Sequence, residues 1–299
     1  MIYTTDQAHF AIAKAARLVG IPRRMVRTVA TDQAGRMDPA GVIRALEEDR
    51  ARGYEPFCLA ATVGTTNTGI VDPLTILVDI AERERLWFHV DAAYGGFFRL
   101  TARGNERLKG IERADSLALD PHKGMFLPFG TGCLLVQDPQ ALLHTHAGDE
   151  AVFFRDVKSG QATDFADLSP ELTRPARGLR LWLPLHLHGV GAFRRELDEK
   201  LDLAQTAWDR LSDMQGISAP APPELSIVTF RAQGWPDDDD HATETLVREV
   251  CADGRFRLTT TLVNGQVSGR LAILGYRTSA IEVEELLHRV HTVTETHLA

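Results

Sequence analysis

The sequence predicts an α/β fold with a mostly parallel sheet, followed by a small C-terminal α+β domain. Short apolar, β-rich runs alternate with helical patterns in the first half of the chain, which is typical of βαβ units and of a sheet with helices on both faces. Strands and helices also mix in the C-terminal third, after the stiff connector 219–223. We therefore expect a large domain at 1–182 and a small domain at 183–299.

The elements of the large domain follow from apolar periodicity and from the residues that begin or end each run. The expected order is a helix that Thr5 or Asp6 caps and Gly20 ends, a strand at 25–29, a helix at 38–52, a strand at 57–63, a helix at 72–85, and strands at 86–90, 116–119 and 133–136. Asp followed by Pro opens two of these helices, because the carboxylate caps backbone N–H groups and proline fits the first turn.

The rest of the chain is less regular at first. No clear period runs from 139 to 175, which predicts a long loop of the kind that often has a function. The expected elements beyond it are a helical region at 178–214, a strand at 226–231, a helix at 243–252, strands at 256–263 and 270–274, and a final helix at 281–297.

The composition argues against several classes of function. A formal net charge of −8 over 299 residues disfavours binding to nucleic acid or to a membrane surface. The cysteines, Cys58, Cys133 and Cys251, are far apart and form no CxxC pair, so they indicate neither a disulfide framework nor a zinc site. The chain shows no signal peptide and no apolar stretch long enough to span a bilayer. We expect a cytoplasmic protein with reduced thiols.

Two strand tips carry the most informative residues. Asp91 follows the apolar run 86–90, and Lys123 follows the run 116–119 after Asp120, Pro121 and His122. The carboxyl ends of strands in an open α/β sheet meet at a ligand-binding crevice. An amine and a carboxylate together suit pyridoxal phosphate (PLP), since the amine holds the cofactor as a Schiff base and the acid keeps its pyridine nitrogen protonated. Taken alone, an Asp at a strand end is more often a helix cap, and a single Lys a solvated charge.

Five motifs, in this order and spacing, resemble the group II amino-acid decarboxylases, which are PLP enzymes of the aspartate-aminotransferase fold (fold type I). The motifs are Asp6-Gln7-Ala8-His9, Ala61-Thr62-Val63-Gly64-Thr65-Thr66, His89-Val90-Asp91-Ala92-Ala93-Tyr94, Asp120-Pro121-His122-Lys123 and the run from Arg174 to Trp182. The resemblance implies that 1–182 is an incomplete PLP-transferase large domain and that the chain decarboxylates an L-amino acid as a carboxy-lyase, with cofactor PLP.

The resemblance also implies a role for each matching residue. Lys123, Asp91 and His9 would be catalytic: the first holds the cofactor, the second pairs with its pyridine nitrogen and the third stacks on one ring face. The remaining cofactor-binding positions are Ala93 under the other face, Thr65 near the phenolic oxygen and His122 near the phosphate. The family usually has Asn where this chain has Asp120, and a carboxylate there would repel a phosphate. Turn formation by Thr65 and a structural role for His9 remain alternatives, as do plain helix-start charges for Arg174, Arg177 and Arg180.

Two departures from the family pattern bear on function. Family members have a long N-terminal portion before the position of Asp6, which contributes to the dimer and to phosphate binding. We therefore expect a homodimer, or association with a chain that supplies this half, and a partner-dependent or non-catalytic subunit is one alternative function.

The second departure is Phe165, which occupies the position where the family's decarboxylases generally have a Tyr that acts as the acid. In some relatives a Phe there accompanies decarboxylation coupled to oxidative deamination, giving an aldehyde. His144, His146 or water could instead serve as the acid, so simple decarboxylation remains the first hypothesis and the aldehyde-forming reaction the alternative.

Overall fold

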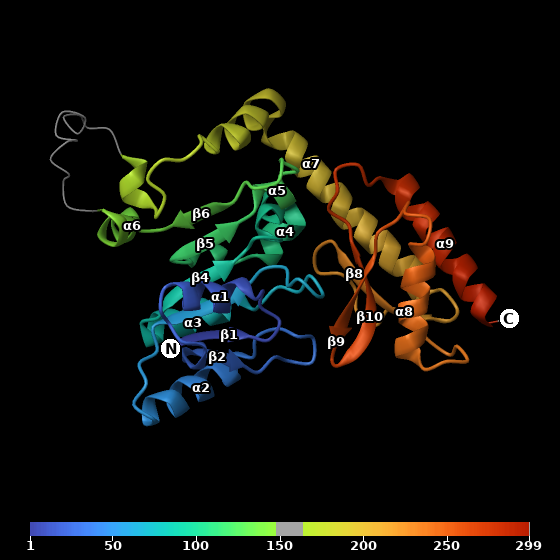
Figure 1. Ribbon diagram of the computed structural model, residues 1–299, viewed down its shortest axis with the longest axis horizontal. Helices are drawn as coiled ribbons and strands as arrows, with labels where there is room; N and C mark the ends of the chain where they lie inside the picture. Colours follow the sequence, from blue (N-terminus) through green and yellow to red (C-terminus); the bar gives the residue numbers. More distant parts are fainter. Residues whose placement is uncertain (148–163, 299) are drawn as a thin grey trace.

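The computed structural model describes residues 1–147 and 164–298 and contains two separate sheets (Figure 1). The first sheet has six strands in the order β2-β1-β3-β4-β5-β6. Its strands are β1 (Ile2–Thr5), β2 (Val26–Val29), β3 (Cys58–Thr62), β4 (Trp87–Asp91), β5 (Ser116–Leu119) and β6 (Cys133–Val136). The first five are parallel and β6 is antiparallel to β5, which confirms the predicted mostly parallel sheet.

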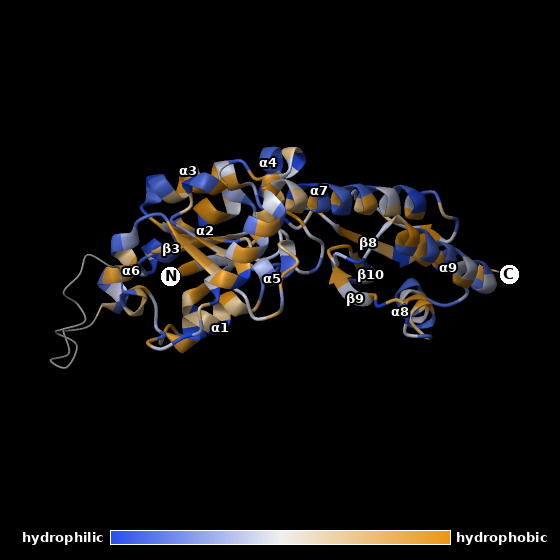
Figure 2. Ribbon diagram, turned by 90° about the horizontal axis from the view of Figure 1, so that it is seen from above, coloured by the Kyte–Doolittle hydropathy of each residue, from blue (hydrophilic) through white to orange (hydrophobic). Residues whose placement is uncertain are grey.

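Helices cover both faces of this sheet (Figure 2). The helices are α1 (Ala11–Leu18), α2 (Pro39–Ala51), α3 (Leu74–Glu84), α4 (Ala102–Arg107), the short α5 (Pro121–Gly124) and α6 (Pro139–His146). Figure 2 shows α2, α3 and α4 on one side and α1 on the other. The connection from β1 to β2 runs in one direction along the sheet, and the connections from β2 to β5 run in the other. Because crossovers between parallel strands are right-handed, helices in connections that run in opposite directions lie on opposite faces of the sheet. The main core lies under α2 and α3.

The first strand corrects the predicted N-terminus. Thr5 does not cap a helix, because Ile2–Thr5 is a fully buried strand between β2 and β3. The first helix begins only at Ala11, and the residue before it, Phe10, makes no side-chain cap. Four residues are too few to show a period of two, so Thr5 resembled a cap when it in fact completes a strand, and Asp6 lies too far before Ala11 to cap the helix.

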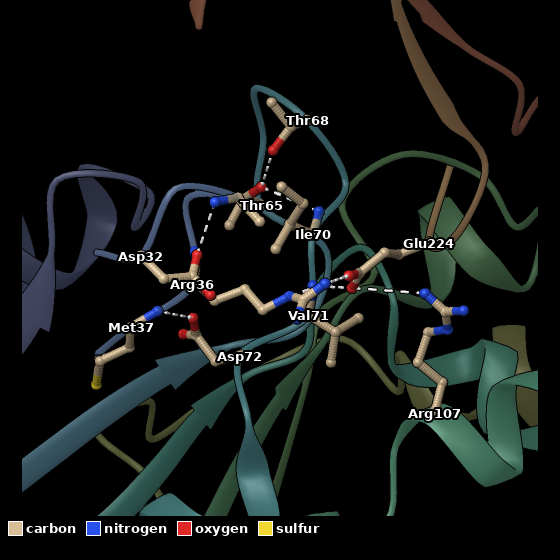
Figure 3. Close-up of polar contacts among 11 residues, drawn as sticks. Asp32, Arg36, Met37, Thr65, Thr68, Ile70, Val71, Asp72, Arg107 and Glu224 are labelled. Atoms are coloured by element: carbon tan, nitrogen blue, oxygen red, sulfur yellow. Dashed lines mark hydrogen bonds and ion pairs between the residues drawn. The ribbon is translucent and has the colours of Figure 1, made fainter. Parts of the chain in front are cut away.

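Asp72 is also not the predicted helix cap. α3 begins at Leu74 without a side-chain cap. The buried Asp72 carboxylate accepts a hydrogen bond from the backbone N–H of Met37 at 2.7 Å (Figure 3). Its other oxygen accepts from the backbone N–H of Thr62 at 2.7 Å. It therefore joins the segment before α2 to the end of β3. Asp38, in contrast, caps α2 as predicted, accepting from the N–H groups of Ala40 and Gly41.

The region 139–175 has more structure than expected. Asp138 caps α6 and Pro139 occupies its first turn, which is the same Asp-Pro signal that opens α2. A 3-10 helix follows at Phe165–Leu168. The expected long loop is therefore wrong at both ends, and its middle part, 148–163, lies outside the described residues.

The second sheet is antiparallel, with the order β7-β8-β10-β9. Its elements are β7 (Ile217–Ser218), β8 (Ile227–Ala232), β9 (Thr259–Val263) and β10 (Gln266–Ala272), with helices α7 (Gly178–Ser212), α8 (Asp239–Val250) and α9 (Ala280–Leu298). Figure 1 shows this sheet between its helices and the loops of the first sheet, as an α+β unit.

The long α7 connects the two cores. It is kinked at Gly189, whose φ of 70° is not helical. Leu197 and Leu201 belong to the core of the first sheet, whereas Leu203 and Ala204 belong to that of the second. The division into 1–182 and 183–299 therefore stays a prediction. Among the residues described, no helix combines the length and the apolar character needed to cross a bilayer.

Replacing Asp72 with Asn should remove the contribution of this carboxyl to the pH dependence of the free energy of unfolding. Burial raises the pKa of Asp72 to about 6, although the bonds from Met37 and Thr62 act in the opposite direction. A carboxyl whose pKa is higher in the folded state stabilises the fold below its ordinary pKa of 3.8, and this contribution is lost as the pH rises through 6. The free energy of unfolding of wild type relative to Asp72→Asn should fall by about 3 kcal/mol between pH 4 and 7.

Urea unfolding of both proteins across this pH range measures the difference. At pH 4 the variant should be less stable than wild type by about 1–3 kcal/mol, because the amide oxygen can accept only one of the two bonds well. By pH 7 this difference should have disappeared or changed sign, because the wild type has lost the contribution of its protonated carboxyl. A difference that stays constant with pH, or that grows as the pH rises, would contradict this account of Asp72.

Candidate functional site

Four of the predicted site residues follow four neighbouring parallel strands. His9 follows β1, Thr65 follows β3, Asp91 ends β4 and Lys123 follows β5. Because these strands are consecutive in the sheet and parallel, their carboxyl ends share one edge. The direction of winding reverses between β1 and β3, and ligands of open α/β sheets bind at such a point. The structure therefore brings these four positions to one edge.

Asp91 lies on the face of the sheet that carries α1. Phe88 and Val90 are buried in the core under α3, and alternate side chains of a strand point to opposite faces. Asp91 is in register with Ala118 of β5 on one side and with Thr62 of β3 on the other. Its neighbours on this face are therefore a methyl group and a threonine side chain, and neither carries a charge.

The Asp91 carboxylate is half-buried and has little to neutralise it. Oδ1 accepts a hydrogen bond from the N–H of Ala93 at 3.1 Å, in the loop that leaves the strand. Within 1–147 and 164–298, no Lys, Arg or His forms an ion pair with it. A half-buried carboxylate without a cation can stabilise a positive charge on a ligand.

His89, two residues before Asp91, points to the same face. Its Nδ1 lies 2.8 Å from Oγ of the buried Ser116 on β5, and the indole N–H of Trp87 donates to the same oxygen at 2.8 Å. Burial lowers the pKa of His89, and the Asp91 carboxylate acts in the opposite direction. A His89 that is neutral near pH 7 places no positive charge beside the Asp91 carboxylate.

Lys123 lies in the short helix α5 with its side chain 41% exposed. Its Nζ is 2.8 Å from Oδ2 of Asp120, which makes this acid its ion-pair partner. His122 Nδ1 lies 2.8 Å from the carbonyl oxygen of Thr131, so the proton of a neutral imidazole is on Nδ1. Its Nε2 is 3.8 Å from the same Asp120 oxygen. Asp120 therefore faces both predicted cofactor contacts.

The hydroxyl of Thr65 is used within its own turn. Thr65 is buried, its Oγ1 accepts from the N–H of Ile70 at 3.2 Å, and it lies 2.9 Å from Oγ1 of Thr68 (Figure 3). These bonds are those expected of a turn former, and a contact with a cofactor stays a prediction. His9 is half-buried at the start of α1, where its Nδ1 accepts from the N–H of Ala11 at 3.3 Å.

Arg174 and Arg177 make contacts within the segment 165–177. Arg174 donates to the carbonyl oxygen of Phe165 and to Ser169, and Arg177 pairs with Glu171 at 2.8 Å. The Phe165 side chain is 68% exposed.

An apolar groove of about 530 Å³ lies near α5, between residues 125–128 and α7, rather than over the strand tips.

Two partners at the site were not predicted. The pair between Asp120 and Lys123 has the three-residue spacing that brings side chains together on one helical turn, so the sequence contains a signal for it. Glu224 also contacts the segment after the Thr65 turn, by accepting from the N–H of Val71 at 2.9 Å. A contact between residues so distant in the chain has no local signal.

A family model described as the pyridoxal-dependent decarboxylase conserved domain matches residues 1–233. The chain is 32% identical over 300 residues to an aromatic-L-amino-acid decarboxylase of Bacillus atrophaeus, covering 99% of this chain and 62% of that protein. It is 31% identical over 286 residues to a phenylacetaldehyde synthase of Petunia hybrida, covering 91% of this chain and 56% of that protein.

The fold is also similar to a solved structure. The crystal structure of Oryza sativa TDC with PLP and tryptamine matches with a TM-score of 0.92 and 27% identity, covering 100% of this chain and 63% of that one. The chain thus spans from 56% to 63% of the length of these three proteins.

Proposed function

Because this chain belongs to the pyridoxal-dependent decarboxylase family, we propose that it forms part of a PLP-dependent carboxy-lyase that removes the α-carboxylate of an L-amino acid. The observation that carries the proposal is the common edge of β1, β3, β4 and β5, which places Asp91 and Lys123 on neighbouring strand tips. Both residues lie within the matched range 1–233.

The residues at this edge fit the cofactor. The Lys123 amine is accessible for a covalent bond to an aldehyde, and the Asp91 carboxylate has no competing cation among the described residues. A carboxylate about 3 Å from a protonated ring nitrogen gains roughly 5 kcal/mol at an effective dielectric constant near 20. When bound, PLP supplies the electron sink that stabilises the charge left at Cα by loss of carbon dioxide.

The remaining residues would orient the ring and the phosphate. Ala93 has a small side chain that permits close approach to one ring face, and His9 would cover the other face and hold or move a proton there. Thr65 would lie near the phenolic oxygen, and His122 would direct Nε2 to the phosphate. We take aromatic L-amino acids as the first substrate class, since the Bacillus relative is named for them.

Replacement of Lys123 with Ala tests this function directly. Wild-type chain with added PLP should show the visible absorbance band of a lysine-bound cofactor and release carbon dioxide from an aromatic L-amino acid. Lys123→Ala should abolish the band and lower the rate by roughly 1,000-fold or more, because alanine has no amine to hold the cofactor.

Lys109→Ala is the matched control, because Lys109 also pairs with an acid three residues away, Glu106, at 2.6 Å. The control should keep both the band and the rate. A wild-type band that survives in Lys123→Ala would contradict the assignment of the cofactor lysine. Absence of any band or turnover in wild-type chain, even with a second chain that supplies the N-terminal portion of the relatives, would sink the proposed function.

Asp120→Asn should bind PLP more tightly than the wild type. Asp120 faces both His122 and Lys123. Its negative charge would repel a phosphate bound near His122, and its ion pair with Lys123 would compete with attachment of the cofactor to the amine. A unit charge removed at about 4 Å in water changes an interaction by about 1 kcal/mol, or roughly fivefold in the dissociation constant. Absorbance titration with PLP measures this constant, and weaker binding would show that Asp120 assists the cofactor.

The aldehyde-forming reaction is the second candidate. Phe165 cannot donate a proton, and one relative at 31% identity is a phenylacetaldehyde synthase. The same assay decides between the two: carbon dioxide and amine without hydrogen peroxide support simple decarboxylation, whereas peroxide and ammonia support the alternative.

We also propose a cytoplasmic homodimer, or a complex with a chain supplying the N-terminal portion of the relatives. All three cysteines are free, which suits a reducing compartment. Large apolar side chains are exposed on and beside α1 and on the first part of α7, namely Phe10, Leu18, Val19, Leu179, Trp182 and Leu187.

Light scattering after gel filtration tests this association. The 33.0 kDa chain should elute at about twice its mass, or should gain mass only when the second chain is added. A stable monomer under both conditions, with a normal absorbance band for bound PLP, would refute the need for a partner.

A further inference from the structure

Glu224 is a half-buried acid at the junction of the two sheets. It follows the connector 219–223 and has a side chain that is only 12% exposed. Its Oε1 accepts from Nε of Arg36 at 3.1 Å and from Nη2 at 2.6 Å. Its Oε2 accepts from the N–H of Val71 at 2.9 Å and lies 3.7 Å from Arg107 (Figure 3). Both carboxylate oxygens are therefore occupied by the first sheet's loops.

The bond to Val71 reaches the Thr65 turn. The carbonyl oxygen of Ile70, directly before Val71, accepts from the N–H groups of Gly64 and Thr65, each at 3.0 Å. The N–H of Ile70 donates to Oγ1 of Thr65. A carboxylate that fixes the N–H of Val71 thus fixes the peptide unit that closes this turn. Charge-assisted bonds of this kind are the stronger ones, which suits a positioning contact.

The residues after Glu224 continue the contact. Leu225 packs against the loops after β3 and β4, so closely that a Cβ on Gly95 would lie 2.6 Å from its Cδ1. Ser226 Oγ is 2.7 Å from the hydroxyl of Tyr94, three residues after Asp91. From β10, Arg270 donates to the carbonyl oxygen of Thr66 at 2.6 Å. The second sheet therefore holds the same two loops that carry Thr65 and Asp91.

We propose that Glu224 is a positioning residue that acts through Val71 and the 64–71 turn to set the place of Thr65 at the cofactor edge. The role assigned to Thr65 rests on the proposed function, whereas the effect of Glu224 on the turn does not. Glu224 contacts neither cofactor nor substrate in this account. Its removal loosens the turn and changes cofactor binding through Thr65, and a merely structural Glu224 would affect all parts of the chain alike.

Hydrogen exchange of the cofactor-free chain tests the first step. In Glu224→Ala, the amides of the 64–71 turn should exchange at least tenfold faster than in wild type, while those of α8 and α9 keep their rates. Glu284→Ala is the matched control, because Glu284 also accepts from an arginine, Arg210, at 2.9 Å, yet joins α7 to α9 away from the turn. Unchanged exchange in the turn, or a uniform increase along the chain, would overturn the proposal.

A double-mutant cycle with Thr65→Val tests the second step. Glu224→Ala and Thr65→Val should each raise the PLP dissociation constant about tenfold, and the double variant should rise no further than either one. Glu224→Ala and Thr65→Val should also shift the ratio of the absorbance bands of lysine-bound PLP in the same direction. Glu284→Ala should change neither the dissociation constant nor this ratio. Additive losses would refute action through Thr65.

Glu224→Gln covers the case in which the alanine variant does not fold. Glutamine keeps one oxygen for the N–H of Val71 and loses the charge that holds the arginines, so exchange in the turn should rise less than tenfold and more than in Glu284→Ala. Wild-type exchange rates in folded Glu224→Gln would contradict the proposal. If wild-type chain forms no band with PLP, the proposed function fails, and the exchange experiment still decides the role of Glu224 in the turn.

Discussion

The parallel pairing of β1, β3, β4 and β5 is the constraint on which the candidate site depends. Residues from positions 9 to 123 share one edge only because each strand ends on the same side of the sheet. The backbone hydrogen bonds between strands fix this alignment, so Asp91 and Ala118 stay in register when the loops after the strands change conformation. A site built from strand tips is therefore rigid where a cofactor ring would need support, and adjustable only in the loops that follow.

Charge is distributed unequally along this edge. Asp91 has no cationic partner within the described parts of the chain, whereas Asp120 is 2.8 Å from the Lys123 amine. A neutral His89 beside Asp91 preserves this difference near neutral pH. The edge thus has one carboxylate without a cation and a second that is paired with the amine. In the proposed function the first would stabilise a positive ring nitrogen, and the second would oppose a phosphate near His122.

The sequence was sufficient for the parts of the fold that have local signals. The runs at 86–90 and 116–119 ended close to where β4 and β5 end, because apolar, β-rich stretches followed by a polar tip have few other interpretations. β1 was missed because four buried residues show no period, and Asp72 because its backbone partners lie 10 and 35 residues away. Glu224 could not be found this way, since it is 153 residues from Val71. Contacts that join distant segments depend on the folded chain and have no local pattern.

The proposed function requires that one amine, that of Lys123 after β5, receives the cofactor. Incubation of the chain with PLP, reduction with borohydride and peptide mass spectrometry would identify the modified lysine. A single phosphopyridoxyl group on Lys123 is expected at stoichiometric PLP. Modification at another lysine of the chain (Lys14, Lys109, Lys158 or Lys200), or an even distribution among all five, would rule out this assignment.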